Sequence, residues 1–327
     1  MHQLPLLDLP NSRHIVNVAS VPQRSPFRYP GGKTWLVPQI RRWFDSLPQK
    51  PALFVEPFAG GGIAGLTAAF EQLADRVLLV ELDEQVASVW EALLGGEAEW
   101  LADRILNFNM TPESLAEELG KGEGSLRDMA FRTLLRNRTS HGGIMAPGAG
   151  FIKYGEGGKG IMSRWYPNTL AKRMRDIGRI RDKLKFIRGD GLQVIRDYSE
   201  RPDAVFFIDP PYTAAGKKAG TRLYTHNGLD HEALFTIAGM LRGDFLMTYD
   251  DAEGVRAMVT RHGFDVVAVA MKNTHHAEMN ELLIGRNLGW ARQFRVPAAP
   301  ADTVRATAGR ALTHPNPRGP APMHLSL

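Results

Sequence analysis

A run of five apolar residues, Ala204-Val205-Phe206-Phe207-Ile208, is followed directly by Asp209-Pro210-Pro211-Tyr212. The run is short and rich in β-branched and aromatic residues, which predicts a buried strand of a parallel sheet. The two prolines end it abruptly, because proline donates no backbone hydrogen bond and restricts the preceding residue to extended conformations. Open α/β sheets bind ligands at the carboxyl ends of such strands. We therefore expect a stiff turn that presents an acid, carbonyl groups and an aromatic ring to a ligand.

This turn suits a planar ring that carries an amino group. The nitrogen of such a group is a poor nucleophile, because its lone pair is delocalised into the ring. The Asp209 carboxylate and the Pro210 carbonyl can each accept one amino hydrogen, and both bonds strengthen as positive charge develops on nitrogen. Tyr212 can stack on the ring and hold it in plane. The candidate catalytic residues are therefore Asp209, Pro210, Pro211 and Tyr212, and this chemistry requires no metal.

Segments with strand and helix patterns alternate along most of the chain. Helices are predicted at 65–73, 84–94 and 192–198. This alternation predicts an α/β fold with a mostly parallel, Rossmann-like sheet. The predicted strands are 53–55, 76–81, 185–188, 204–208, 245–249, 265–270 and 281–284.

The alternation stops between residues 107 and 183, where helices are predicted without strands. We expect this segment to be an inserted, largely helical lobe. The core would then consist of residues 25–106 and 184–296. Residues 1–24 lack periodicity and residues 297–327 are rich in alanine and proline, so both ends are expected to be flexible.

A glycine-rich turn, Glu56-Pro57-Phe58-Ala59-Gly60-Gly61-Gly62, follows the first predicted strand and opens a helix. Glycine permits a close approach of the backbone to a ligand, and the helix start offers free N–H groups. Glu81 ends the next strand, where an acid can accept hydrogen bonds from ribose hydroxyls. Asp83 is the alternative, although it lies past the expected strand end. The pattern predicts a nucleoside-containing ligand, but a dinucleotide site or a plain tight turn has the same signature.

Charge is distributed unevenly along the chain. The net charge is +5, yet residues 71–130 carry 14 acidic and 4 basic residues, while residues 131–188 carry 3 acidic and 14 basic residues. A basic lobe of this kind predicts a polyanionic partner. The alternative is a solvated helix face without a partner.

Three boxes occur in a fixed order: Phe27-Arg28-Tyr29-Pro30-Gly31-Gly32-Lys33, the turn at 56–62, and, after the basic insertion, the turn at 209–212. In this order they resemble the Dam-like (alpha-group) DNA adenine-N6 methyltransferases, over roughly residues 27–288. The resemblance implies transfer of a methyl group from S-adenosylmethionine to an adenine flipped out of duplex DNA. The alternatives are an amino-group methyltransferase acting on RNA or protein, and a catalytically inactive relative that only binds DNA.

The resemblance also implies roles for individual residues. Lys33 would pair with the methionine carboxylate of the cofactor or reach the target nucleotide. Asp190 would contact the adenine end of the cofactor, although an N-cap of the following helix explains it equally well. The expected cofactor-binding residues are Tyr29, Gly31, Gly32, Lys33, Glu56, Pro57, Phe58, Gly60, Gly62, Glu81, Asp190 and Asp209.

The resemblance implies that the inserted lobe, residues 107–183, recognises the DNA target. Its basic residues would supply the DNA contacts that offset the cost of flipping a base, roughly a few kcal/mol. Arg164-Trp165-Tyr166 is either a stacking wedge or part of the packing of the lobe. The arginines and asparagine after residue 130 would contact phosphates or base edges, and those after residue 170 would clamp phosphates or face solvent. The expected DNA-binding residues are Arg132, Arg136, Asn137, Arg138, Lys172 and Arg173.

The chain has no cysteine, which excludes disulfides, thiolate zinc sites and cysteine nucleophiles. It has no apolar run approaching about 18 residues, so we expect no membrane span. We expect a cytoplasmic monomer, in the bacterial nucleoid or in a phage-infected cell. Double-stranded DNA is the expected partner, and a cognate restriction endonuclease is a further candidate.

Overall fold

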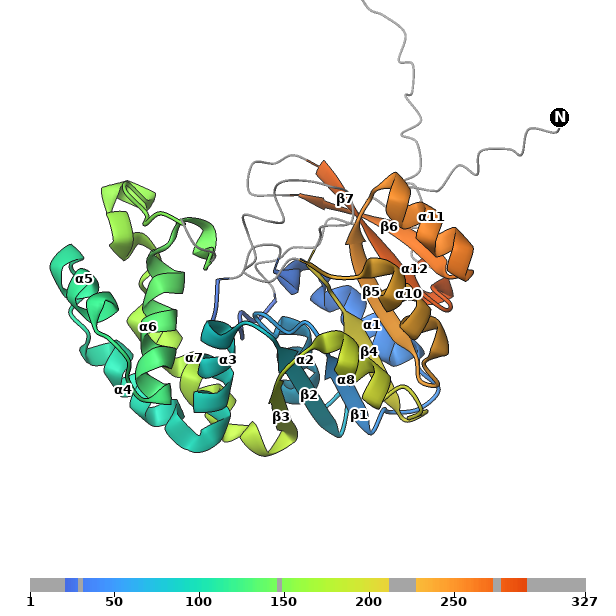
Figure 1. Ribbon diagram of the computed structural model, residues 1–327, viewed down its shortest axis with the longest axis horizontal. Helices are drawn as coiled ribbons and strands as arrows, with labels where there is room; N and C mark the ends of the chain where they lie inside the picture. The colour runs from blue at the N-terminus through green and yellow to red at the C-terminus, as the bar shows by residue number, and fades with distance from the viewer. Residues whose placement is uncertain (1–20, 29–31, 146–148, 212–227, 273–277, 293–327) are drawn as a thin grey trace, which may run out of the picture. The chain divides into compact units, whose positions relative to one another are not determined.

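The structure is a computed structural model and describes residues 21–28, 32–145, 149–211, 228–272 and 278–292. These residues belong to one compact unit built around a seven-stranded sheet (Figure 1). Every predicted strand is present, with bounds that differ from the prediction by three residues at most. The strands are β1 Leu53–Glu56, β2 Arg76–Glu81, β3 Leu184–Arg188, β4 Ala204–Ile208, β5 Phe245–Asp250, β6 Asp265–Lys272 and β7 Glu278–Gly285.

The order of strands in the sheet is β3-β2-β1-β4-β5-β7-β6. Strands β1 to β5 are parallel, whereas β7 is antiparallel to both β5 and β6. The chain order reverses between β1 and β4, and such a switch point opens a crevice at the carboxyl ends of the strands. The predicted α/β fold with a mostly parallel, Rossmann-like sheet is confirmed.

Helices cover both faces of the sheet because successive strand residues point to opposite sides. Phe54 and Leu79 join one hydrophobic cluster, and their neighbours Val55 and Leu78 join the other. Within the described ranges, no helix is long and apolar enough to cross a membrane. The first cluster includes residues of the 3₁₀ turn η2 Lys33–Leu36 and of helices α1 Val37–Ser46, α2 Ile63–Phe70, α3 Glu84–Ala92 and α12 Gly289–Arg292. The second includes residues of α8 Gly191–Asp197, α10 His231–Met240 and α11 Glu253–His262.

The predicted insertion is helical and packs beside α3 (Figure 1). Thr111 caps α5 Pro112–Gly120 by accepting a hydrogen bond from Ser114 N. Phe131 and Met174 share one hydrophobic cluster with Trp90 of α3, so the insertion has no separate core. The boundaries 107–183 stay a prediction, since this packing already includes α4. The helices are α4 Ala98–Asn107, α5 Pro112–Gly120, α6 Leu126–Thr139 and α7 Pro167–Arg179.

Part of the uneven charge of the sequence cancels inside this helical layer. Arg175 of α7 lies 2.7 Å from both Glu99 and Asp103 of α4. Within the acidic segment itself, Arg104 of α4 also lies 3.0 Å from Glu118 of α5. The basic segment therefore folds against the acidic segment that precedes it, and only some of its cations remain for a partner.

Candidate active site

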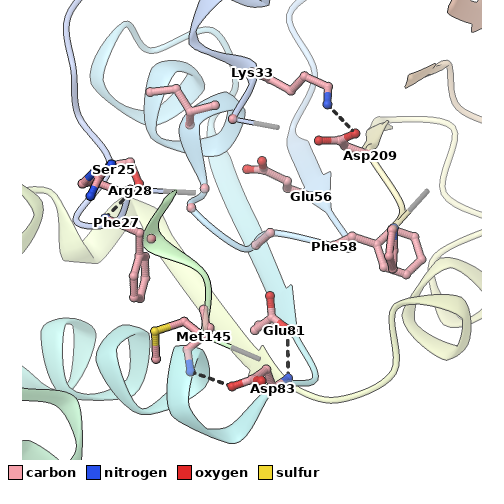
Figure 2. Close-up of a pocket in the computed structure, with 18 of the residues that line it drawn as sticks. Ser25, Phe27, Arg28, Lys33, Glu56, Phe58, Glu81, Asp83, Met145 and Asp209 are labelled. Atoms are coloured by element: carbon pink, nitrogen blue, oxygen red, sulfur yellow. Dashed lines mark hydrogen bonds and ion pairs between the residues drawn. The ribbon is translucent and has the colours of Figure 1, made fainter. Parts of the chain in front are cut away.

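A cavity of about 720 Å³ opens where the carboxyl ends of the central strands meet the helical layer (Figure 2). Its wall includes residues from all three boxes, although these are far apart in the sequence. The cavity therefore collects most of the predicted cofactor-binding residues. Those in its wall are Gly32, Lys33, Glu56, Pro57, Phe58, Gly62, Glu81, Asp190 and Asp209.

Glu81 ends β2, and its carboxylate accepts three backbone hydrogen bonds. Oε2 accepts one from Gly60 N at 2.9 Å, and Oε1 accepts two, from Leu82 N at 2.8 Å and Asp83 N at 2.9 Å. Burial raises the pKa of Glu81 to about 7, although these amides oppose the rise. A carboxylate offers about four acceptor positions, so roughly one of them, on Oε2, remains for a ligand hydroxyl.

Two other acids of the cavity wall cap helices. Asp83 Oδ1 accepts hydrogen bonds from Gln85 N and Val86 N at 2.9 and 3.1 Å, at the start of α3. Asp190 Oδ1 accepts one from Leu192 N at 2.8 Å, at the start of α8. The N-cap interpretation of Asp190 is therefore confirmed, and its contact with a cofactor stays a prediction.

Two amides in and just after the glycine-rich turn bind the protein itself. Gly60 N donates to Glu81, and Gly65 N donates to Glu56 Oε2 at 2.6 Å. Gly62 has φ +62°, and a side chain there would collide with a buried indole ring. The expectation of free N–H groups is therefore wrong for Gly60 and Gly65 and stays a prediction for the other amides. Gly60 is not among the residues of the cavity wall, and its amide holds the Glu81 carboxylate through a hydrogen bond.

Asp209 follows β4 and belongs to a buried cluster of charges (Figure 2). Lys33 Nζ lies 2.9 Å from Asp209 Oδ1 and 3.0 Å from Glu281 Oε1. Thr248 Oγ1 donates a hydrogen bond to the same Oδ1 at 2.8 Å. Burial lowers the pKa of Lys33, but the two carboxylates outweigh burial and raise it above its ordinary value. Lys33 thus pairs with the candidate catalytic acid, a partner that the sequence had not indicated.

Glu56 ends β1 and is only 3% exposed. Burial raises the pKa of Glu56 to about 8; the Gly65 amide opposes this rise and the charge of Asp209 adds to it. Glu56 is therefore mostly protonated at neutral pH, and it adds little negative charge beside Asp209.

Four arginines form the wall of the cavity on its helical side. Arg28 precedes η2, Arg138 lies in the last turn of α6, and Arg173 lies on α7. Arg164 belongs to a short 3₁₀ turn that precedes α7. Arg138 and Arg173 were predicted to bind DNA, but the structure places both in the cavity wall. The cavity therefore has an acidic half on the sheet and a basic half on the helices.

The side chain of Asn137 is fully buried, which corrects the DNA contact predicted for it. Its Oδ1 accepts a hydrogen bond from Arg28 N at 2.8 Å. Its Nδ2 donates to Arg28 O at 2.8 Å and to Gly143 O at 2.9 Å. With these bonds made, the amide ties two chain segments to α6 and is not available to a nucleic acid.

The remaining candidates for DNA binding lie outside the cavity. Arg132 Nη1 donates to Gly122 O at 2.9 Å and so holds the connection between α5 and α6. Lys172 is exposed and pairs with Asp176 on the same helix. Arg136 is half-buried. Their contacts with DNA stay predictions.

Two roles were considered for the segment 164–166, a stacking wedge and packing of the lobe, and its residues differ in which of them they suit. Trp165 is 5% exposed and its ring lies 6.1 Å from the ring of Phe108, so it packs the helical layer. Tyr166 is 49% exposed and lines the cavity together with Arg164. Packing is thus confirmed for Trp165 only.

Pro210 is buried and Pro211 lines the cavity beside Asp209. Tyr29, Gly31 and Tyr212 lie outside the described residues. The roles predicted for these three residues stay predictions.

Sequence reasoning did not identify Glu281 or Thr248, which complete the cluster around Lys33. Glu281 directly precedes the apolar run Leu282-Leu283-Ile284 of β7, and Thr248 directly follows the apolar run Phe245-Leu246-Met247 of β5. Buried polar groups need partners, so their positions were a usable signal. The identity of the partner could not follow from that signal, because it depends on the antiparallel placement of β7 next to β5.

Residues 29–122 match the family model of D12 class N6 adenine-specific DNA methyltransferases. This segment contains most of the first box, the glycine-rich turn and Glu81, and the match confirms the resemblance there. No protein of curated function matches the chain significantly. Together with the fold, the family match supports methyltransferase activity.

Two solved methyltransferase structures resemble the chain weakly. The rRNA methyltransferase aviRa from Streptomyces viridochromogenes is 15% identical, with a TM-score of 0.37 over 79% of this chain and 86% of that one. A precorrin-6y C5,15-methyltransferase from Geobacter metallireducens is 9% identical, with a TM-score of 0.34 over 77% and 86% of the two chains. Similarities this low carry no argument about the methyl acceptor.

Proposed function

We propose that the protein is a site-specific DNA adenine-N6 methyltransferase that uses S-adenosylmethionine and acts on an adenine flipped out of duplex DNA. One observation carries the proposal: Asp209, in its Asp-Pro-Pro turn, and Glu81 open into the same cavity from the ends of β4 and β2. The family match over residues 29–122 supports the choice of adenine in DNA.

The cavity fits the proposed cofactor. Its volume of about 720 Å³ is in the usual range for a ligand of that size. Glu81 keeps an acceptor position for a ribose hydroxyl, and Phe58 offers a partly buried ring on which adenine can stack. When bound, S-adenosylmethionine supplies an electrophilic methyl group on a sulfonium sulfur.

The residues around Asp209 suit the activation of an amino group. Lys33 and Thr248 fix one oxygen of the Asp209 carboxylate. The carboxylate can then accept one amino hydrogen of the base, and the Pro210 carbonyl can accept the other. Both bonds strengthen as the nitrogen becomes positive during its attack on the methyl group, so they stabilise the transition state more than the ground state.

The segment 149–166 suits contact with nucleic acid. Phe151, Tyr154 and Tyr166 expose 46%, 81% and 49% of their surface, and Lys153 and Lys159 are exposed between them. Aromatic rings interleaved with cations can stack on bases and attract the phosphate backbone. Tyr166 also lines the cavity, so this segment lies at the entrance that a flipped base would use.

The test is single-molecule sequencing of methylation-free plasmid and genomic DNA after incubation with purified protein and S-adenosylmethionine. We expect N6-methyladenine in one short sequence context, and none with an Asp209→Asn variant. Parallel reactions with radiolabelled methyl groups would contain RNA and protein from the same cells.

N4-methylcytosine in the same reads would retain DNA as the substrate but overturn adenine as the target. Label that enters only RNA or protein would overturn DNA as the substrate. A protein that binds S-adenosylmethionine and labels none of these acceptors would leave the inactive relative as the better explanation.

A further inference from the structure

Arg138 is a buried cation and Arg173 is a half-buried one, and neither has a carboxylate partner among the residues that the structure describes. Arg138 is 5% exposed, and its Nη2 donates to Pro26 O at 2.7 Å. Its Nε is buried and has no hydrogen-bond partner within the described ranges. Arg173 Nη1 donates to Ser25 O at 3.0 Å. Backbone carbonyls therefore satisfy only part of the hydrogen-bonding capacity of these two guanidinium groups. Both side chains also line the cavity.

This arrangement is unfavourable in the absence of a ligand. Burial, with repulsion by Arg173 and Arg28, lowers the pKa of Arg138 to about 9, and burial also lowers the pKa of Arg173. Arg138 nevertheless stays protonated at neutral pH. Buried charges are normally paired, because removing a charge from water without a partner costs several kcal/mol. An anion that enters the cavity would supply the missing partner.

Arg138 and Arg173 contact the backbone carbonyls of Pro26 and Ser25, the two residues that precede Phe27 and Arg28. Figure 2 shows Phe58 on one side of the cavity and Phe27 and Arg28 on the other, with Glu56 and Glu81 between them. A ligand whose adenine stacks on Phe58 and whose ribose reaches Glu81 would therefore direct its remaining part towards the arginines.

Lys33 is paired with carboxylates of the protein itself. Its ammonium group lies within 3.0 Å of both Asp209 and Glu281. The resemblance implies that Lys33 pairs with the methionine carboxylate or reaches the target nucleotide, and both roles stay predictions. Arg138 and Arg173 are cations of the cavity wall that no carboxylate of the described residues pairs.

We propose that Arg138 and Arg173 bind the carboxylate of the amino-acid part of S-adenosylmethionine. The inference rests on the proposed use of that cofactor and deepens it. A guanidinium group forms paired, charge-assisted hydrogen bonds with a carboxylate, and the unpartnered Nε of Arg138 is one such donor.

A phosphate of the nucleic acid is the weaker choice of anion. A backbone phosphate carries a nucleotide on each side and requires an open surface. Arg138 has almost no open surface and is reached through the cavity. A small terminal carboxylate fits this position better.

The test compares two ligands that share adenosine and a thioether sulfur: S-adenosylhomocysteine, which has the amino-acid part, and 5′-methylthioadenosine, which lacks it. Isothermal titration calorimetry would measure both dissociation constants for the full-length protein. The variants are Arg138→Met and Arg173→Met. The matched control is Arg179→Met, which removes an arginine from α7 that pairs with Asp176 outside the cavity.

The unsubstituted protein and the control are expected to prefer S-adenosylhomocysteine. In Arg138→Met we expect affinity for that ligand to fall by about 30-fold, and affinity for 5′-methylthioadenosine to change by less than about twofold, as for loss of charge-assisted bonds to the carboxylate alone. Arg173→Met should shift the ratio in the same direction by about 10-fold. The melting temperature of ligand-free Arg138→Met should not fall, because the substitution removes an uncompensated buried charge.

An unchanged ratio of affinities would overturn the inference, and weaker retention of DNA with an unchanged ratio would assign the arginines to a phosphate. An equal loss of both ligands together with a lower melting temperature would make Arg138 a structural residue. If the unsubstituted protein binds neither ligand, the proposed function fails along with the inference. If it binds both but methylates no DNA, only the proposed acceptor fails.

Discussion

The two halves of the cavity hold their charges in opposite ways. On the sheet side, Glu81 accepts three backbone hydrogen bonds and Asp209 is held by Lys33 and Thr248. On the helical side, Arg138 donates one hydrogen bond to a backbone carbonyl, and its buried Nε has no partner in the part of the chain that the structure describes. Charges that the protein pairs itself are held in a fixed geometry, which suits catalysis. Charges that it leaves partly unpaired favour a ligand of opposite sign.

Asp209→Asn gives the largest expected effect and tests whether the sheet side carries the chemistry. The amide keeps the size of the side chain but loses the charge that draws on the amino hydrogen. We expect the single-turnover rate of methyl transfer to fall by about a thousandfold or more, as for loss of a group aimed at developing charge. Affinity for S-adenosylmethionine, measured by calorimetry, should change little.

The matched control is Asp251→Asn, which follows β5 and pairs with Arg256 outside the cavity. Its rate of transfer should stay close to that of the unsubstituted protein. Near-normal turnover in Asp209→Asn would remove Asp209 from the mechanism and place the chemistry elsewhere in the cavity.

Glu81→Ala tests whether, on the sheet side of the cavity, Glu81 binds the cofactor while Asp209 carries the chemistry. The substitution removes the acceptor of a ribose hydroxyl, so we expect affinity for S-adenosylhomocysteine to fall by about 100-fold. Asp83→Asn is the matched control, because asparagine also caps a helix and should preserve α3. A loss confined to DNA affinity, or a larger loss in Asp83→Asn, would contradict the assignment of Glu81.

Glu281→Gln tests whether the pairing of Lys33 matters for catalysis. The carboxylate lies 3.0 Å from Lys33 Nζ and 4% of Glu281 is exposed, so glutamine keeps the packing and removes the charge. Lys33 should then hold Asp209 less well, and we expect the rate of transfer to fall by about 10-fold. The dissociation constant of the cofactor should change by less than about threefold. An equal change in both quantities would indicate a purely structural role.

The sequence predicted the sheet side of the cavity well, for a physical reason. Glu56, Glu81 and Asp209 each follow a short apolar strand, and the carboxyl ends of neighbouring parallel strands meet at one edge of the sheet. Strand periodicity is local, so it places these acids without knowledge of tertiary contacts. The same reasoning left Glu281 out, because β7 is antiparallel and its pairing with β5 is not encoded locally.

The sequence predicted the helical side poorly. Arg138 and Asn137 are adjacent in a basic helix, and both were expected to face DNA. In the structure one lines the cavity and the other is buried in hydrogen bonds to the segment around Arg28. The count of charges does not reveal which cations pair within the protein, as Arg175 does with acids of the preceding segment. Which face of a helix meets the core depends on its packing partners, which the charge pattern does not reveal.

Glu56→Gln is expected to act on stability, and the pH dependence of that stability distinguishes the sheet side of the cavity from the helical side. Burial raises the pKa of Glu56 from 4.5 to about 8. Between these values the folded protein holds a proton that the unfolded chain has released, so stability should fall as the pH rises from about 5 to 8. Urea denaturation across this range would measure the free energy of unfolding. In Glu56→Gln the fall should be smaller by about 3–4 kcal/mol, at about 1.4 kcal/mol for each unit of pKa shift.

The helical side should not contribute to this dependence. The pKa of Arg138 is lowered only to about 9, so its charge is constant below pH 8. Arg138→Met should therefore keep the slope of the unsubstituted protein between pH 5 and 8, whereas Glu56→Gln should flatten it. Glu81, with a pKa of about 7, should account for part of the slope that remains in Glu56→Gln. A stability that rises over this range, or an unchanged slope in Glu56→Gln, would show that Glu56 is ionised in the folded protein and that the sheet side carries more negative charge than the structure implies.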